Sequence, residues 1–150
     1  MKEFGDERIA NGEKCLVVDL GACTGMDSTF MGTLAGMAAR LSSQKGTLQI
    51  ADPGARNRRS LEDLGLDFLM AIDPPEAIWR GKVDPIRECL SPPNHGPAPD
   101  QLERVKQVLE AHQLLAGTNE KNSRTFSNVV TLLEAEVAEK QKLANSSETK

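Results

Sequence analysis

Hydrophobic residues along the first half of the chain form short runs and helical stripes. A nearly continuous apolar run at 15–20 predicts a buried strand, of the kind that is covered on both faces. From Thr29 onward, apolar residues recur at spacings of three and four, so they share one face of a predicted helix. The polar residues at 42–46 close this helix, with Gly46 as its C-terminal stop.

The same alternation continues for one more unit. A second strand at 47–51 leads to a helix at 56–64, which is capped by Gly65, and a third strand is predicted at 68–72. Strands that alternate with helices are typical of a parallel sheet with right-handed crossovers. The pattern therefore predicts an α/β domain over residues 1–76, with crossover helices on one side of its sheet.

The second half of the chain has a different composition. Residues 77–99 are rich in proline and predict a linker, in which Trp79 either docks back onto its own domain or serves as an anchor for a partner. Residues 100–144 carry two amphipathic stripes separated by a turn at 117–119, so they predict a helical hairpin. The polar residues 145–150 predict a disordered tail.

The caps of the two hairpin helices can also be read from the sequence. Asp100 stands in the cap position of a capping box, and Asn122 or Ser123 is expected to cap the second helix. A single hairpin cannot bury both of its stripes. We therefore expect it to pack on the first domain, on a copy of itself or on a partner.

Composition and charge argue against two classes of protein, those that bind nucleic acid directly and those that span a membrane. The net charge of −4 argues against direct binding of nucleic acid, and no apolar run approaches the length that spans a bilayer. With no signal peptide at the start, we expect a cytoplasmic protein. Three cysteines without metal-ligand spacing predict buried, reduced thiols. The two histidines, His95 and His112, stand in segments that look peripheral, and no cofactor or metal is expected.

The candidate functional residues lie in the loop between the first predicted strand and the helix that follows it. The tripeptide Asp27-Ser28-Thr29 can cap this helix, because its side-chain oxygens accept from the free N–H groups of the first turn. It also displays the Ser28 hydroxyl at the positive end of the helix dipole. Plain capping and a reversible phosphorylation site are both consistent with this tripeptide.

A wider set of residues carries a family resemblance. Asp19-Leu20, Met26 to Thr29 and Gly32, followed by the strand at 47–51 and the segment at 59–67, resemble the STAS domain of anti-sigma factor antagonists. The resemblance implies a STAS-like sheet and a non-enzymatic signalling role. It also implies that an anti-sigma factor serine kinase phosphorylates Ser28 and that a PP2C-type phosphatase reverses the reaction.

In this interpretation the unmodified protein docks on the kinase, frees a sigma factor and so regulates transcription. The docking face is expected to comprise the residues around Ser28, namely Met26, Asp27, Thr29, Phe30 and Met31. A phosphate there adds about −1.5 to −2 charges. Burial of such a group without a partner at an interface costs several kcal/mol, which is about a thousandfold or more in affinity.

Two departures from the family pattern stand out. Phe30 occupies a position where the family usually has glycine, which puts the identity of the partner in question. Only fourteen residues precede Cys15, whereas the family has two strands and a helix there. A sheet edge left uncovered invites pairing with another chain, so dimerisation through that edge or through the hairpin is a further hypothesis.

Two other functions are considered. One is a STAS-like scaffold that is not phosphorylated and that uses the helical hairpin to assemble with itself or with other signalling proteins. An enzyme is the third possibility, because Asp19, Asp27 and Asp52 all fall near strand ends, where three carboxylates could bind magnesium.

Overall fold

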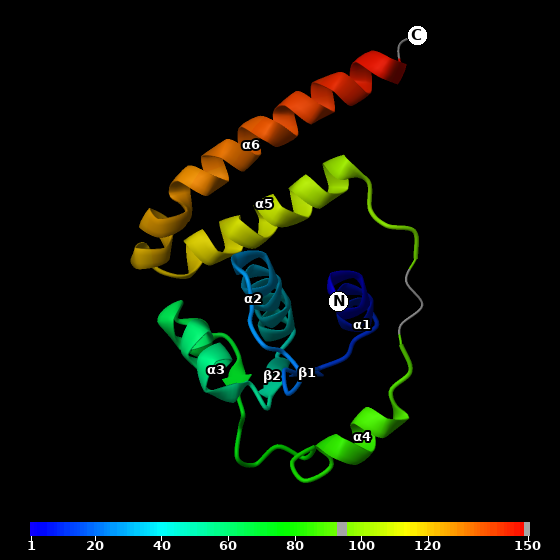
Figure 1. The fold of residues 1–150 in the computed structure, drawn as a ribbon, viewed down its shortest axis with the longest axis vertical. Coiled ribbons are helices and arrows are strands. Elements are labelled where there is room, and N and C mark those ends of the chain that lie inside the picture. The colour runs from blue at the N-terminus through cyan, green and yellow to red at the C-terminus, as the bar shows by residue number, and fades with distance from the viewer. Residues whose placement is uncertain (93–95, 149–150) are drawn as a thin grey trace.

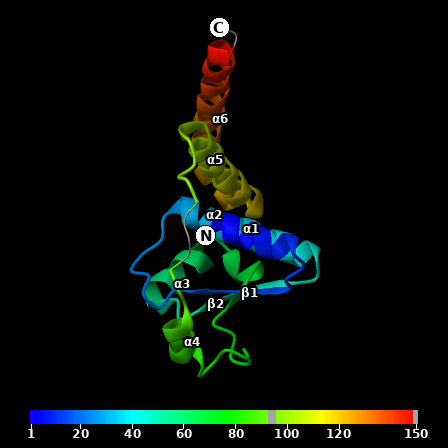
Figure 2. The same cartoon turned by 90° about the vertical axis from the view of Figure 1, so that its right-hand side faces the viewer.

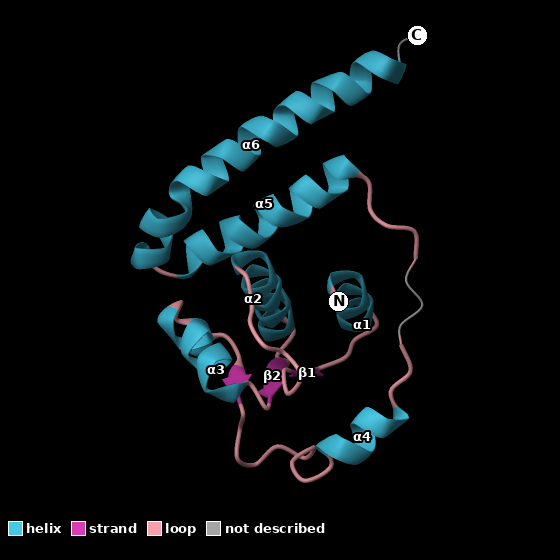
Figure 3. Cartoon of the chain, in the orientation of Figure 1, coloured by secondary structure: helices cyan, strands magenta, loops and turns pink. Residues whose placement is uncertain are grey.

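Three short parallel strands form the centre of the fold (Figures 1 and 3). The computed structural model describes residues 1–92 and 96–148. The strands are β1 (Cys15–Asp19), β2 (Thr47–Ala51) and β3 (Ala71–Ile72), in the spatial order β1-β2-β3. β1 and β2 pair along their whole length, whereas β3 pairs only through its two residues. The predicted parallel α/β sheet is confirmed.

The first crossover helix, α2 (Ser28–Ser43), begins and ends for local reasons. Asp27 is its N-cap, and a carboxylate oxygen of Asp27 accepts the N–H of Phe30 at 2.7 Å. At the other end, Lys45 and not Gly46 takes the left-handed conformation, with φ of 59°. Gly46 is needed for another reason, because a Cβ there would lie 2.5 Å from the Lys14 carbonyl oxygen.

The second crossover is longer than the sequence suggests, and the strand that follows it is shorter. Helix α3 (Gly54–Asp63) is followed by Gly65 in the left-handed conformation, with φ of 68°, as the cap prediction requires. The chain then makes a 3₁₀ turn, η1 (Leu66–Phe68), which the N–H of Leu69 closes on the Leu66 carbonyl. The turn takes up residues that were expected to be strand, so β3 is reduced to two residues.

One hydrophobic core lies on a single face of the sheet. Helix α1 (Lys2–Ala10) lies beside α2 on this face (Figure 2), and Leu61 of α3 belongs to the same buried cluster. The cluster comprises Ile9, Leu20, Leu34, Ala35, Met37, Ala38, Leu41, Leu48, Ile50, Leu61, Leu66, Met70 and Leu115. Since only one face is covered in this way, β1 alternates between exposed and half-buried residues, and the expected burial on both of its faces is wrong.

The segment predicted as a linker is partly structured. Trp79 is 7% exposed, and its indole N–H donates to Oε1 of Gln49 at 2.7 Å. The expectation that Trp79 docks on its own domain is therefore confirmed. Helix α4 (Val83–Cys89) follows and lies on the side of the sheet opposite α1 and α2 (Figure 2). His95 lies outside the described residues.

The C-terminal hairpin consists of α5 (Gln101–Thr118) and α6 (Glu120–Glu148), which lie side by side (Figure 1). Asp100 caps α5, and its carboxylate accepts the N–H of Glu103 at 2.8 Å. Asn119 alone separates the helices. Its Oδ1 accepts the N–H of Asn122, so Asn119 does the capping that was expected of Asn122 or Ser123.

Helix α6 also runs beyond the expected end of the hairpin. It continues through Glu148, into the segment 145–150 that was predicted to be a disordered tail. Within this stretch, the hydroxyl of Ser146 donates to the Lys142 carbonyl, a bond that follows the helix backbone. Residues 149–150 lie outside the described part of the chain.

The thiols are not buried as expected. Cys15 and Cys89 are exposed and Cys23 is half-buried, and all three are free. Cys15 is exposed because it lies on the uncovered face of β1, and Cys89 because it ends the surface helix α4. No helix in the described residues has both the length and the apolar character that crossing a membrane requires.

Candidate functional site

The loop from β1 to α2 is held in place at its start and near its middle. Leu20 is buried, and its N–H donates to the Ala51 carbonyl at 2.8 Å. Further along, the Cys23 carbonyl accepts the side-chain amide of Asn57 at 2.7 Å. These bonds position Ser28 as the first residue of α2, close to the carboxyl end of the sheet.

The hydroxyl of Ser28 contacts a histidine from the distant end of the chain. Its Oγ lies 2.9 Å from Nε2 of His112, which belongs to α5. His112 is only 6% exposed, and the edge of its ring packs against Phe126 of α6 at 5.7 Å between centroids. The expectation that this histidine is peripheral is therefore wrong, because the hairpin folds back over the start of α2.

The contact of the second ring nitrogen, Nδ1, shows which nitrogen of His112 carries the proton. Nδ1 lies 2.7 Å from the Val108 carbonyl oxygen, which can only accept a hydrogen bond, so Nδ1 carries a proton. In the neutral ring Nε2 is then an acceptor, and the Ser28 hydroxyl donates to it. Ser28 itself is half-buried.

Two glycines allow α5 to approach α2 closely. A Cβ at Gly32 would lie 2.2 Å from the carbonyl oxygen of Ala111, and one at Gly36 would lie 2.7 Å from Cδ1 of Leu114. The absence of side chains at these two positions, one helical turn apart, is what lets the backbones meet. The same face of α5 inserts Leu115 into the core.

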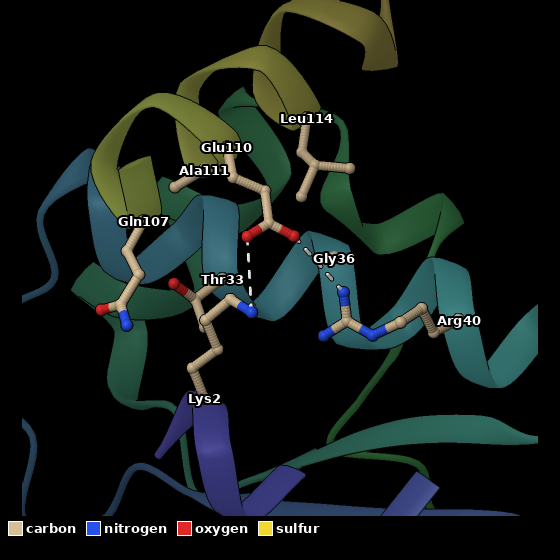
Figure 4. Close-up of a pocket in the computed structure, with 8 residues that line it drawn as sticks. All are labelled: Lys2, Thr33, Gly36, Arg40, Gln107, Glu110, Ala111 and Leu114. Carbon is tan, nitrogen blue, oxygen red and sulfur yellow. Dashed lines mark ion pairs between the residues drawn. The ribbon is translucent and has the colours of Figure 1, made fainter. Parts of the chain in front are cut away.

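Charged side chains reinforce this contact at its edge, and Figure 4 shows three of them, Lys2, Arg40 and Glu110. Glu110 of α5 lies 3.4 Å from Nζ of Lys2 and 3.8 Å from a guanidinium nitrogen of Arg40. Asp6 of α1 pairs with the same two cations. The four side chains join α1, α2 and α5, and all of them except Asp6 line a small pocket.

The far end of the hairpin is held by an amide. Asn122 is 1% exposed, and its side-chain N–H groups donate to the Leu64 carbonyl at 2.8 Å and to the hydroxyl of Thr118 at 2.6 Å. The Leu64 carbonyl at the end of α3 also accepts from Asn119. Of the three expected places for the hairpin, the structure therefore places it on the first domain.

The residues expected to form a docking face differ in exposure. Asp27 is exposed, whereas Met26, Thr29, Phe30 and Met31 are half-buried like Ser28. The side chains of Met26, Phe30 and Met31 pack against the core.

The acidic residues near the strand ends do not gather into a metal site. Asp19 and Asp52 are both bound by Arg87 of α4, with the shortest N···O distances at 2.6 and 2.9 Å. Hydrogen bonds from Arg87, with a further one from the Gly21 N–H, hold the pKa of Asp19 below its usual range. Asp27 instead caps α2. In residues 1–92 and 96–148, no group of three or more potential ligands could hold a metal ion.

Sequence reasoning missed two long-range contacts near the candidate site, those of His112 with Ser28 and of Arg87 with Asp19. A signal existed for His112, because it falls within the apolar stripe of α5. A histidine in such a stripe needs a polar partner, and Ser28 provides it. Nothing in the sequence pairs Arg87 with Asp19, since 68 residues separate them.

One comparison with known proteins gives a match. Residues 1–71 match the family model described as "Mlab, STAS domain". No curated protein and no solved structure matches the chain. The matched segment includes the strand β1, the loop and Ser28, and it ends before the hairpin that carries His112.

Proposed function

Because residues 1–71 match the STAS domain family model, we propose that this chain is a phosphorylation-switched protein-interaction module with Ser28 as the phosphoacceptor. Its partner is an anti-sigma factor with a serine kinase domain, and docking of the unmodified form releases a sigma factor for transcription. A PP2C-type phosphatase returns the modified form to the active state. The protein works in the cytoplasm and is not an enzyme in this scheme.

The observation that carries the proposal is the position of the Ser28 hydroxyl. Ser28 opens α2 directly after the strand-to-helix loop, and it is half-buried rather than enclosed. Its neighbour Asp27 is exposed, and the Asp27 carboxylate is engaged in capping. A hydroxyl at this place can be reached from outside once its contact with His112 is broken.

The chemistry asks little of the acceptor chain. The kinase supplies ATP, magnesium and the base. The γ-phosphoryl group passes from ATP to Oγ of Ser28, ADP leaves, and the hydroxyl proton goes to the base of the kinase. His112 accepts from the same hydroxyl in the resting protein, so the kinase must displace this 2.9 Å hydrogen bond first.

The added charge acts on docking more than on folding. At the start of α2, the helix dipole favours an anion by about 0.3 to 1 kcal/mol. At a protein interface, the same dianion without a partner costs several kcal/mol. Phosphorylation of Ser28 therefore leaves the domain folded but prevents it from binding the anti-sigma factor.

The test is phosphorylation in vitro. The purified full-length chain is incubated with radiolabelled ATP and, one at a time, with purified candidate anti-sigma factor serine kinases of the source organism. We expect one kinase to label the wild type and the Ser42→Ala control, in which an exposed serine of the same helix is removed, but not Ser28→Ala. The proposal is contradicted if Ser28→Ala is labelled as strongly as the wild type, or if none of these kinases labels the wild type.

A second candidate function has its own supporting observation. The Ser28 hydroxyl already has a partner in His112, as expected of a serine with a structural role. In this alternative the chain is a STAS scaffold without phosphorylation, which assembles with signalling proteins or with a second copy through the edge of β1. A chain that no kinase labels, and that forms a dimer in light scattering, is the result this alternative predicts.

A further inference from the structure

Residue His112 is fixed beside Ser28 whatever the state of the serine. Its Nδ1–H is held by the Val108 carbonyl at 2.7 Å within α5, and its ring edge packs against Phe126. Neither contact involves Ser28. The orientation of Nε2 toward Oγ of Ser28 is therefore built into the hairpin.

This arrangement lets the ring bond to two different groups. When Ser28 carries a hydroxyl, neutral Nε2 accepts from it. When Ser28 carries a phosphate, the ester oxygen has no proton to donate. A protonated ring then keeps the Nδ1–H bond to Val108 and donates its second N–H to the phosphate.

The surroundings of the ring favour the second state once a phosphate is present. Among the described residues, no carboxylate forms an ion pair with His112, so the phosphate would be its only anionic partner. Phe126 from α6, Val108 on α5 and Ser28 from α2 are the groups that face the ring in the described contacts. A buried cation with one buried or half-buried anion is the pairing that a low dielectric strengthens.

The start of α2 adds further donors. The Asp27 carboxylate and carbonyl take up the N–H groups of Phe30 and Met31. Within residues 1–92 and 96–148, no acceptor meets the backbone N–H of Ser28 or Thr29. These two N–H groups remain available to a phosphate on Ser28.

We propose that the α5–α6 hairpin is a built-in phosphoserine-binding element, in which His112 binds the phosphate on Ser28 and clamps α5 onto α2. This inference rests on the proposed function for the existence of the phosphate. It assigns a role to a residue outside the matched segment 1–71. The hairpin then stays docked in both states and holds more tightly in the phosphorylated one.

The test needs no kinase. Phosphoserine is introduced at position 28 of the full-length chain by genetic code expansion, and the protonation state of the His112 ring is read by NMR at neutral pH. We expect an imidazolium ring in the phosphorylated chain. We also expect hydrogen exchange of the α5 amides to slow by about fivefold, because hydrogen bonds between charged groups exceed neutral ones by about 1 kcal/mol.

Two controls separate the charge from the size of the side chains. His112→Gln keeps a hydrogen-bonding group that cannot become charged, so phosphoserine should no longer slow exchange in α5. Phosphoserine at exposed position 42, at the other end of α2, should leave the His112 ring unchanged.

Several results would overturn the inference. They are a neutral His112 ring in the chain with phosphoserine at position 28, faster exchange throughout α5, or failure of that chain to fold. None of them depends on a kinase or partner. A failure here therefore leaves the proposed switch intact, and a chain that no kinase labels would leave this binding property measurable.

Discussion

Replacing Gly32 by alanine tests whether the hairpin is held by the close crossing of α2 and α5. The new Cβ would lie 2.2 Å from the Ala111 carbonyl oxygen and 2.6 Å from its carbonyl carbon. Both atoms belong to the backbone, so no side-chain rotation relieves the overlap. Since ordinary contacts begin at 3.4 Å, α5 must move away by about 1 Å.

The cost can be estimated from its parts. Overpacking of this kind costs about 1–3 kcal/mol, and loss of the Ser28–His112 hydrogen bond adds about 1 kcal/mol. Alanine has a better helix propensity than glycine, which offsets this loss by up to about 1 kcal/mol. For a chain of this size, the net loss of about 1–3 kcal/mol lowers the melting temperature by about 3–10 °C.

The assay is thermal unfolding followed by far-UV circular dichroism, with two matched variants. Gly117 lies in α5, the other helix of this crossing, and a Cβ there meets nothing within 4 Å. Gly117→Ala should therefore leave the melting temperature unchanged or raise it. Gly36→Ala meets only the movable ends of the Leu114 and Arg40 side chains and should fall between the two. A melting temperature for Gly32→Ala as high as that of Gly117→Ala would refute the close crossing.

Three further predictions concern polar contacts. Arg87→Gln should lower the urea midpoint near neutral pH and have a smaller effect at about pH 3. The pair with Arg87 lowers the pKa of Asp19, so it stabilises the fold above about pH 4. This stabilisation is lost as the pH falls through the folded-state pKa of Asp19. Glu110→Gln should cost up to about 1 kcal/mol in urea unfolding at low salt and less at high salt; equal losses at both would contradict an ionic contribution. Asn122→Ala should cost about 1–3 kcal/mol in the same assay, because its buried amide gives up two hydrogen bonds, one to the Leu64 carbonyl and one to the Thr118 hydroxyl; wild-type stability would show that this amide is dispensable.

The parts of the fold that were predicted correctly depend on neighbours in sequence. The cap at Asp27, the cap at Asp100 and the left-handed Gly65 were read from a few adjacent residues, and the structure confirms all three. Helix periodicity likewise located the core of α2. Local chemistry decides these features, so the sequence displays them directly.

Features that depend on distant segments were not predictable in the same way. The apolar stripe of α5 shows that a face must be buried, but it does not say against what. The spacing of Gly32 and Gly36 becomes meaningful only when α5 lies across them. The role of His112 follows from that packing, since 84 residues separate it from Ser28.

Two errors share another cause, the uncovered face of the sheet. A continuous apolar run at β1 suggested cover on both sides, whereas Cys15 at the start of that run lies on the face that is left exposed. Helix α4 and Trp79 cover this face only in part, so Val17 is 42% exposed. Hydrophobic runs predict strands well, but they do not reveal whether one or both faces of the sheet are covered.

The most direct test of the switch compares two forms of one protein. Once labelling has identified the kinase, its affinity for the unmodified chain and for the chain with phosphoserine at position 28 is measured by titration calorimetry. The account predicts binding that is at least about a hundredfold weaker for the phosphorylated form, because the kinase surface would have to desolvate a phosphate for which it offers no counter-charge. Equal affinities for the two forms would contradict it.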